Sequence, residues 1–294
     1  MKKTLAGTSE AGFNLPPLLV TRAVEAALLE DLGLVGDITT NATVSASARA
    51  SAVFAARGPG VISGLDVARE AFRILDPSVK FEALLHDGAQ INAKQVAAKV
   101  SGPARAILTG ERVALNFMGR MSGIATLTRL YTDAISGTNS RIADTRKTTP
   151  GLRAFEKYAV RCGGGQNHRT GLFDAILIKD NHIVAAGGIK AAINAARSHA
   201  GHMVKIEVEV DTLDQLKELL EHKIDAVLLD NMTPDMLRKA VAMAGGRVIT
   251  EASGGVNLQT VRAIAETGVD LISVGALTHS AMVLDLGLDF DSAT

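Results

Sequence analysis

The chain has one cysteine, no tryptophan and no excess of charge of either sign. Its 294 residues contain 31 Lys and Arg and 31 Asp and Glu, with aromatic residues at 3%. Proteins that bind nucleic acids usually carry a basic face or aromatic rings that stack on bases, so this composition argues against a nucleic-acid partner. The single cysteine, Cys162, cannot form a disulfide within one chain, which is typical of a reducing compartment. We therefore expect a cytoplasmic protein.

Long apolar runs are also missing. After Met1-Lys2-Lys3 the sequence has no continuous apolar stretch of the kind that follows the basic start of a signal peptide. No segment approaches the roughly 18 apolar residues that a membrane-spanning helix needs. We therefore expect neither a secretion signal nor a membrane partner.

The second half of the chain alternates short apolar runs with helical patterns. Six apolar runs are expected to be strands, at residues 141–143, 175–178, 206–210, 226–229, 248–250 and 271–274. The helical patterns between the later runs lie at about residues 188–199, 212–222, 233–244 and 256–267. Apolar strands separated by helices indicate a parallel sheet covered by helices. A repeat of just over twenty residues is tight for a Rossmann sheet and typical of a (β/α) barrel.

The first half is mixed. Strands are expected near residues 50–56, 60–63, 80–85, 90–92 and 97–101. Helices are expected at residues 24–32, 68–75 and 109–136, the first of them ending at Gly33. This mixed order indicates an α+β layer, unlike the regular alternation of the second half.

Each apolar run of the second half ends in polar residues. The six endings are Asp144–Lys147, Lys179–His182, the acidic set Glu207, Glu209 and Asp211, then Asp230–Asn231, Glu251–Gly255 and Gly275–Ala276. Catalytic groups at the carboxyl ends of several strands are what a barrel active site requires. Strand ends turn polar for turn formation alone, but basic and acidic residues mixed at six successive ends exceed what turns need.

The segment from Asp144 to His182 carries a local excess of positive charge. It contains seven Lys and Arg against four Asp and Glu, and it includes a run of three glycines at 163–165. Cations beside flexible glycines indicate a small site for an anionic ligand. The cations expected at this site are Arg146, Lys147, Arg169 and Lys179, whereas a solvated face is the expected place of Arg153, Lys157 and Arg161.

Two glycine-containing segments end the last two strands. They are Ser253-Gly254-Gly255 and Val274-Gly275-Ala276. In barrels, the loops after the last strands often hold a phosphate with backbone N–H groups, where a side chain would prevent close approach. Gly254-Gly255 alone could be only a turn before a helix. As a pair, the two segments indicate a phosphate site.

Two carboxylates, Glu209 and Asp230, end successive strands. Carboxylates among cations could hold Mg²⁺ or stabilise a developing positive charge. Glu207 faces the same side of the strand as Glu209, and the residues alone do not separate their roles. His168 could bind an anion, move a proton or make an ordinary structural hydrogen bond. The sequence contains no metal-binding spacing of His or Cys residues, no P-loop and no nucleophile elbow.

Several of these segments together resemble the quinolinate phosphoribosyltransferase family. The resemblance rests on residues 144–153, 163–169, 177–182, 206–210, 228–231, 251–255 and 273–279, and upstream segments at 30–33, 36–40 and 111–116 also match. It implies an α/β fold with an N-terminal α/β sandwich domain at residues 1–122 and an incomplete (β/α) barrel at 123–279. A C-terminal tail, 280–294, would pack back on the first domain.

The resemblance also implies an activity. Members of the family join quinolinate to phosphoribosyl pyrophosphate (PRPP) with Mg²⁺, releasing CO₂ and pyrophosphate and giving nicotinate mononucleotide for NAD synthesis. They work as homodimers in which the N-terminal domain of one subunit covers the barrel site of the other. The family pattern favours Glu209 over Glu207, because of its spacing to Asp230.

The residues of this site follow from the same resemblance. The expected catalytic residues are Lys147, Glu209 and Asp230, of which the last two would also hold Mg²⁺, mainly through PRPP. The expected substrate-binding residues are Arg112 from the second subunit, and Thr145, Arg146, His168, Arg169, Lys179, Ser253, Gly254, Gly255, Val274, Gly275, Ala276 and His279. Two other functions compete with this one. One is a related phosphoribosyltransferase with another acceptor, as in the paralogues associated with molybdenum uptake. The other is a sensor that binds phosphoribosyl ligands without catalysis, which would not need Lys147.

Overall fold

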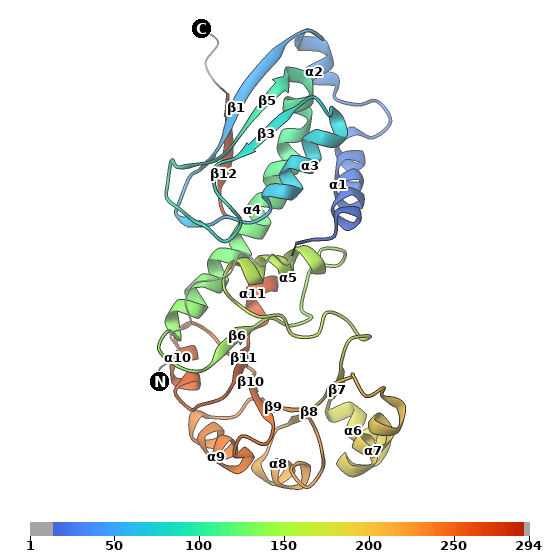
Figure 1. The fold of residues 1–294 in the computed structure, drawn as a ribbon, viewed down its shortest axis with the longest axis vertical. Helices are drawn as coiled ribbons and strands as arrows, with labels where there is room; N and C mark the ends of the chain where they lie inside the picture. Colours follow the sequence, from blue (N-terminus) through green and yellow to red (C-terminus); the bar gives the residue numbers. More distant parts are fainter. Residues whose placement is uncertain (1–13, 291–294) are drawn as a thin grey trace.

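The N-terminal unit is an antiparallel sheet covered by helices. The structure, a computed structural model, describes residues 14–290 (Figure 1). Its four-stranded sheet has the order β12 (Leu286–Phe290), β1 (Arg49–Ala56), β5 (Val96–Pro103) and β3 (Lys80–Ala83). The other elements of this unit are α1 (Pro17–Leu32), α2 (Ile38–Thr43), β2 (Gly60–Val61), α3 (Leu65–Leu75) and β4 (Gln90–Ile91).

Aromatic side chains fill the centre of this unit. Phe54 lies on β1 and Phe72 on α3, with ring centroids 6.0 Å apart in an edge-on arrangement, and Phe81 of β3 contacts both. Such pairs add to the stabilisation that comes from burying their apolar area. Strand β12 pairs with β1 in antiparallel register, from Ala52 opposite Phe290 to Ala56 opposite Leu286. The sequence patterns did not indicate this last strand.

One long helix connects the two units. Helix α4 (Ala104–Ala134) has 31 residues, and at 1.5 Å per residue it is about 46 Å long. It packs against α3 at one end and α5 at the other. At Gly123 a Cβ atom would overlap the carbonyl oxygen of Met282, so only glycine lets the returning chain lie this close to α4.

The second unit is an open barrel of six parallel strands. Their order is β6 (Arg141–Ala143), β11 (Leu271–Ser273), β10 (Ile249–Ser253), β9 (Ala226–Asp230), β8 (Ile206–Val210) and β7 (Ile176–Ile178). The strands form an arc with β6 and β7 at its two edges (Figure 1). The accompanying helices are α5 (Arg153–Cys162), α6 (Asp180–Ala186), α7 (Ile189–His199), α8 (Leu213–Leu219), α9 (Pro234–Ala244), α10 (Val261–Ala265) and α11 (Ala276–His279). The expected fold class, a sandwich-like N-terminal domain and an incomplete barrel, is confirmed.

The order of strands and helices brings all six carboxyl ends to one rim. Strands β8 and β9 are almost entirely buried, because helices cover one face and barrel side chains fill the other. The helices begin where the sequence provides caps. Thr212, for example, accepts a hydrogen bond from the backbone N–H of Gln215, whose own side chain reaches back to the backbone of Thr212. Within residues 14–290, no helix is long and apolar enough to cross a membrane.

Candidate active site

A cavity of about 730 Å³ opens at the carboxyl rim of the barrel. Its walls include every residue expected at the site except one, namely Thr145, Arg146, Lys147, His168, Arg169, Lys179, Glu209, Asp230, Ser253, Gly254, Gly255, Val274, Gly275, Ala276 and His279. The exception is Arg112, which is exposed on helix α4 of the N-terminal unit and does not line this cavity. Its expected contribution from a second subunit stays a prediction.

Two arginines on one wall have unsatisfied hydrogen-bond donors. The Nε atoms of Arg146 and Arg169 are both buried, and neither has a hydrogen-bond partner. Burial lowers the pKa of Arg169, and the neighbouring positive charge of Arg146 lowers it further. A planar carboxylate would suit this pair of arginines, because it accepts hydrogen bonds from paired N–H donors and neutralises the positive charge.

A buried ion pair supports this wall. Lys157 of α5 donates to the carboxylate of Asp144, and the two side chains are 3% and 0% exposed. Asp144 also accepts from the Asn167 side chain at 2.6 Å and from the His168 backbone at 2.9 Å. The expectation that Lys157 lies on a solvated face is therefore wrong. Its partner Asp144 stands thirteen residues earlier at a strand end, and only the folded arrangement brings the two charges together.

A second buried network holds the loop that carries Lys147. Arg120 of α4 donates to one oxygen of Glu156 at 2.7 Å, and the other oxygen accepts the backbone N–H of Thr149 at 3.1 Å. Thr278 of α11 donates to the backbone oxygen of Lys147 at 2.7 Å. These contacts fix the chain on both sides of Lys147, so its side chain extends over the rim from a rigid base.

Another part of the cavity wall contains the glycine segments, Ser253–Gly255 and Val274–Ala276. Gly254 has a φ of +91°, and a Cβ atom there would overlap the side-chain amide of Asn231. The aliphatic stem of Lys147 passes so close to Gly275 that a Cβ atom would lie 2.9 Å from Lys147 Cδ. Neither position has room for a side chain, and both segments line the cavity, where glycine backbone can bind an anionic phosphate group.

Two carboxylates stand between these walls. Glu209 accepts a hydrogen bond from Lys179 across the rim, and Asp230 accepts one from the side chain of Asn231 at 2.6 Å. Glu209 lines the cavity, whereas Glu207 is not among its lining residues and turns toward His168. Carboxylate oxygens are the ligands that Mg²⁺ prefers, so the donor set suits this ion.

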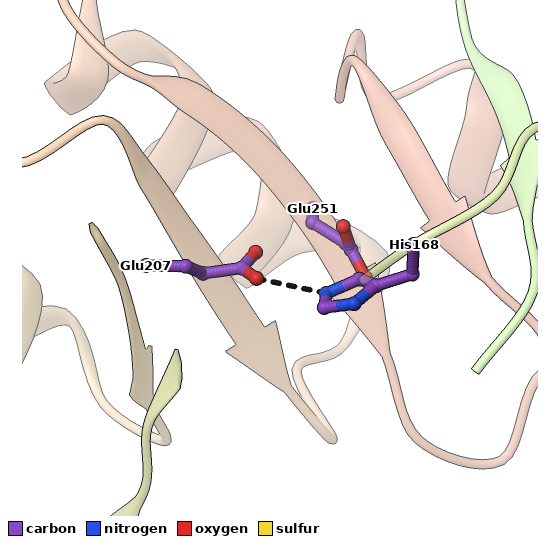
Figure 2. Close-up of side chains that lie close together, drawn as sticks. All are labelled: His168, Glu207 and Glu251. Atoms are coloured by element: carbon purple, nitrogen blue, oxygen red, sulfur yellow. Dashed lines mark hydrogen bonds and ion pairs between the residues drawn. The ribbon is translucent and has the colours of Figure 1, made fainter. Parts of the chain in front are cut away.

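Three titratable side chains, His168, Glu207 and Glu251, point toward one another inside the barrel (Figure 2). His168 Nε2 lies 2.8 Å from an oxygen of Glu207 and 3.7 Å from an oxygen of Glu251. His168 Nδ1 accepts the backbone N–H of Arg169 at 2.7 Å, which leaves Nε2 as the protonated nitrogen that donates to Glu207. Burial disfavours a charged imidazole, but the two carboxylates outweigh burial and raise the pKa of His168.

Sequence comparisons agree with this architecture. The family described as "Quinolinate phosphoribosyl transferase, C-terminal domain" matches residues 124–289, and the corresponding N-terminal domain family matches residues 37–122. The chain belongs to the quinolinate phosphoribosyltransferase family. Over 263 residues it is 46% identical to the probable nicotinate-nucleotide pyrophosphorylase (carboxylating) of Bacillus subtilis (strain 168), covering 89% of this chain and 90% of the relative.

Two further relatives of the family extend the match. The chloroplastic nicotinate-nucleotide pyrophosphorylase (carboxylating) of Arabidopsis thaliana is 44% identical and covers 98% of this chain and 88% of its own length. The structure of the nicotinate-nucleotide pyrophosphorylase from Francisella tularensis superimposes with a TM-score of 0.91 at 41% identity, covering 95% of this chain and 98% of that one. The likeness to this quinolinate phosphoribosyltransferase relative therefore extends through both units.

The most important residue that sequence reasoning missed is Glu251. Its side chain is 2% exposed on β10 inside the barrel, and one of its oxygens has no hydrogen-bond partner. Burial, followed by the negative charge of Glu207, raises the pKa of Glu251 to about 7. An acidic residue within an apolar strand was the available signal. It was interpreted only as part of a polar strand end.

The raised pKa of Glu251 should make the free energy of unfolding of this protein depend on pH. Its pKa rises from 4.5 to about 7 on folding, so stability is fully present below pH 4.5 and is lost as the pH rises toward 7. We expect Glu251→Gln to remove a penalty of up to roughly 3 kcal/mol. In thermal melts, the variant should have a higher melting temperature than the wild type at pH 8 but not at pH 5. If the melting temperatures of the variant and the wild type differ by the same amount at both pH values, the raised pKa of Glu251 is contradicted.

Gly254→Ala should disturb the glycine segment of the cavity wall selectively. The alanine would occupy a left-handed conformation and meet Asn231, and strain of 1–3 kcal/mol corresponds to a rise in the KM for the phosphorylated substrate of roughly 10-fold. The matched control is Gly246→Ala, which has a φ of +72° but no atom within 4 Å of its Cβ position. Steady-state kinetics on both variants measure the effect, and equal changes in the two would refute a local role for Gly254.

His182 and Cys162 contribute to the fold and not to the cavity. The ring nitrogen Nδ1 of His182 accepts the backbone N–H of Lys179 at 3.0 Å, which fixes the start of α6 beside the cavity. Burial raises the pKa of Cys162 to about 12, so its thiol is a poor nucleophile. Neither side chain lines the cavity.

Proposed function

We propose that the protein transfers the phosphoribosyl group of PRPP to the ring nitrogen of quinolinate, with loss of CO₂. The products would be nicotinate mononucleotide, CO₂ and pyrophosphate, in de novo NAD biosynthesis. The observation that carries this proposal is the pair of buried, unpartnered Nε donors of Arg146 and Arg169, in a cavity that the glycine segments also line. One wall suits a dicarboxylate and the other a phosphate. Membership of the family supports the same pairing of substrates.

The quinolinate wall would consist of Arg146, His168, Arg169 and Lys179 with Thr145 beside them. Lys179 is paired with Glu209 in this structure. A substrate carboxylate would replace Glu209 as the partner of Lys179, and Glu209 would then be available to the ribose. Quinolinate binding thus prepares the second half of the site through an exchange of carboxylates.

The PRPP wall would use the glycine segments for the 5′-phosphate and the two carboxylates for the ribose. The phosphate segments are Ser253–Gly255 and Val274–Ala276, with His279 beside the second. Glu209 and Asp230 would hold Mg²⁺, mainly through PRPP, and the ion would supply charge neutralisation for the pyrophosphate leaving group. Lys147 extends over Gly275, where its point charge would stabilise the same leaving group.

The chain's own residues would perform three tasks. They position the pyridine nitrogen, which is itself the nucleophile, against the ribose carbon. Glu209 would stabilise the positive charge that develops on the ribose as pyrophosphate leaves. The arginine wall would hold the quinolinate carboxylates while the ring nitrogen becomes cationic, and the positive charge of that nitrogen would then stabilise the electron pair that the departing 2-carboxylate leaves on carbon 2. No strong general base is needed.

We also propose that the protein is a homodimer with shared sites. Apolar side chains are exposed on and after α1, at Leu18, Leu29, Leu34, Val35 and Ile38, and exposed apolar patches of this kind mark interaction surfaces. A second subunit that covers this surface could bring Arg112 to the open side of the cavity. We place the protein in the cytoplasm, because its single thiol is that of a chain without disulfides. Microscopy of a fluorescent fusion tests that location.

The acceptor decides between this function and its alternative. Purified protein should use quinolinate as acceptor in the presence of PRPP and Mg²⁺, and nicotinate, which lacks the 2-carboxylate, should react at least about 100-fold more slowly because one arginine would remain unpaired. Chromatography of the nucleotide products measures the preference. Turnover with a different aromatic acid, and none with quinolinate, would support the paralogue associated with molybdenum uptake.

A further inference from the structure

Decarboxylation leaves a chemical requirement that the residues assigned so far do not meet. When the 2-carboxylate leaves as CO₂, its bonding electron pair stays on carbon 2 of the ring, beside the cationic nitrogen. Carbon 2 of the product carries hydrogen, so a proton must be supplied at that carbon. This inference rests on the proposed function and concerns the source of that proton.

The cluster of Glu207, His168 and Glu251 lies on the quinolinate side of the cavity. His168 directly precedes Arg169, and Glu207 is close enough to influence the charge of Arg169. Both His168 and Glu251 line the cavity. The three side chains come from β8, β10 and the segment before β7, and they point toward one another inside the barrel (Figure 2). The group is therefore placed beside the carboxylate that is lost.

Only one member of the cluster has both an uncommitted atom and access to the cavity. The two ring nitrogens of His168 are engaged, one with Glu207 and the other with the backbone of Arg169. Glu207 is not among the lining residues. Glu251 lines the cavity and is 2% exposed, and its buried oxygen Oε1 lies 3.7 Å from His168 Nε2 without a hydrogen bond; Glu207 Oε1 is likewise buried without a hydrogen-bond partner, but Glu207 does not line the cavity. A bare carboxylate oxygen in that setting is costly, whereas a carboxylic acid there is not.

We propose that Glu251, as a carboxylic acid beside Glu207 and His168, donates the proton that replaces the 2-carboxylate of quinolinate. The bond between carbon 2 and the carboxylate breaks, the electron pair stays on carbon 2, and CO₂ leaves. The O–H bond of Glu251 then breaks, its proton joins carbon 2 through that pair, and Glu251 is left as a carboxylate. Water entering the open cavity after product release returns the proton.

The surroundings of Glu251 keep it protonated near neutral pH. Burial is the largest influence, and the negative charge of Glu207 on β8 adds to it. His168 and a hydrogen bond with Ser273 on β11 oppose them, while Asp144 after β6 contributes a further negative charge, and the pKa of Glu251 settles at about 7. An acid with a pKa near the working pH is the most effective proton donor.

The test separates the two chemical steps. Wild type, Glu251→Gln and the surface control Glu266→Gln are mixed with quinolinate, PRPP and Mg²⁺ in single-turnover rapid-quench experiments. Pyrophosphate release reports ribosylation, and nicotinate mononucleotide reports decarboxylation with protonation. We expect Glu251→Gln to release pyrophosphate within about 3-fold of the wild-type rate, but to form product at least about 10-fold more slowly and to accumulate quinolinate mononucleotide. Glu266→Gln should match the wild type, because Glu266 is an exposed residue directly after α10 that does not line the cavity.

The outcomes distinguish a failure of this inference from a failure of the proposed function. If Glu251→Gln forms product at the wild-type rate, or loses both steps equally while remaining folded, Glu251 is not the proton donor. If the wild type releases no pyrophosphate with quinolinate, the proposed function fails instead. If Glu251→Gln does not fold, the pH dependence of the two steps in the wild type tests the proposal. Its second step should slow above pH 7 while ribosylation does not, and parallel pH profiles would overturn the proposal.

Discussion

Lys147→Ala is expected to lower kcat by at least about 100-fold while leaving the fold intact. The Lys147 side chain lies on Gly275 between the two walls of the cavity, and none of the ion pairs within residues 14–290 involves it. Its charge is therefore available to the pyrophosphate that leaves. The loop on both sides is held by Glu156 and Thr278 through backbone contacts that alanine retains.

Thermal melts and steady-state kinetics together check this result. The matched control is Lys205→Ala, because Lys205 is 75% exposed and pairs with Asp225 at the opposite end of β8. Lys205→Ala should keep full activity, and the KM for quinolinate should change little in Lys147→Ala. Unchanged turnover in Lys147→Ala would show that the assigned role is wrong.

Mixing two inactive variants should restore activity. Arg112 is exposed on α4 and does not line the cavity of its own chain, so it would complete the site of a second subunit. In a mixed dimer of Arg112→Ala and Lys147→Ala subunits, one site combines an intact Lys147 with an intact Arg112. Random exchange in a two-fold symmetric dimer should recover about a quarter of wild-type activity.

The control for this experiment pairs Lys147→Ala with a subunit that carries both substitutions. That mixture contains no complete site and should stay inactive. Native mass spectrometry verifies that subunits have exchanged. If exchange occurs and the Arg112→Ala mixture stays inactive, each site is built within one chain.

Much of the fold could be predicted from periodicity. The run from Ile206 to Val210 was located to the residue, because its apolar residues alternate with Glu207 and Glu209 at the two-residue period of a strand. The positions of the rim residues followed from the rule that parallel strands end at one edge. The resemblance implied that residues 280–294 pack on the first domain, but no local pattern indicated strand β12 itself, because its pairing with β1 depends on a partner more than 200 residues away.

The interior charges could not be predicted in the same way. Lys157 resembles a solvated helix residue until the fold places it against Asp144, and Glu251 resembles a strand-end residue until it lies under His168. A buried charge is stabilised by partners that are distant in the sequence, so its burial is a property of the assembled structure. The residues that line the cavity were easier to identify, because cations, carboxylates and glycines recur at the ends of successive parallel strands, which meet at one rim.

The most direct test of the whole account follows the 2-carboxylate. Quinolinate labelled with ¹³C at that carboxylate is incubated with the protein, PRPP and Mg²⁺, and the labelled CO₂ is measured beside pyrophosphate and nicotinate mononucleotide. The account predicts equal amounts of the three products and no label in the nucleotide. Pyrophosphate released without labelled CO₂, or a nucleotide that keeps the label, would contradict it.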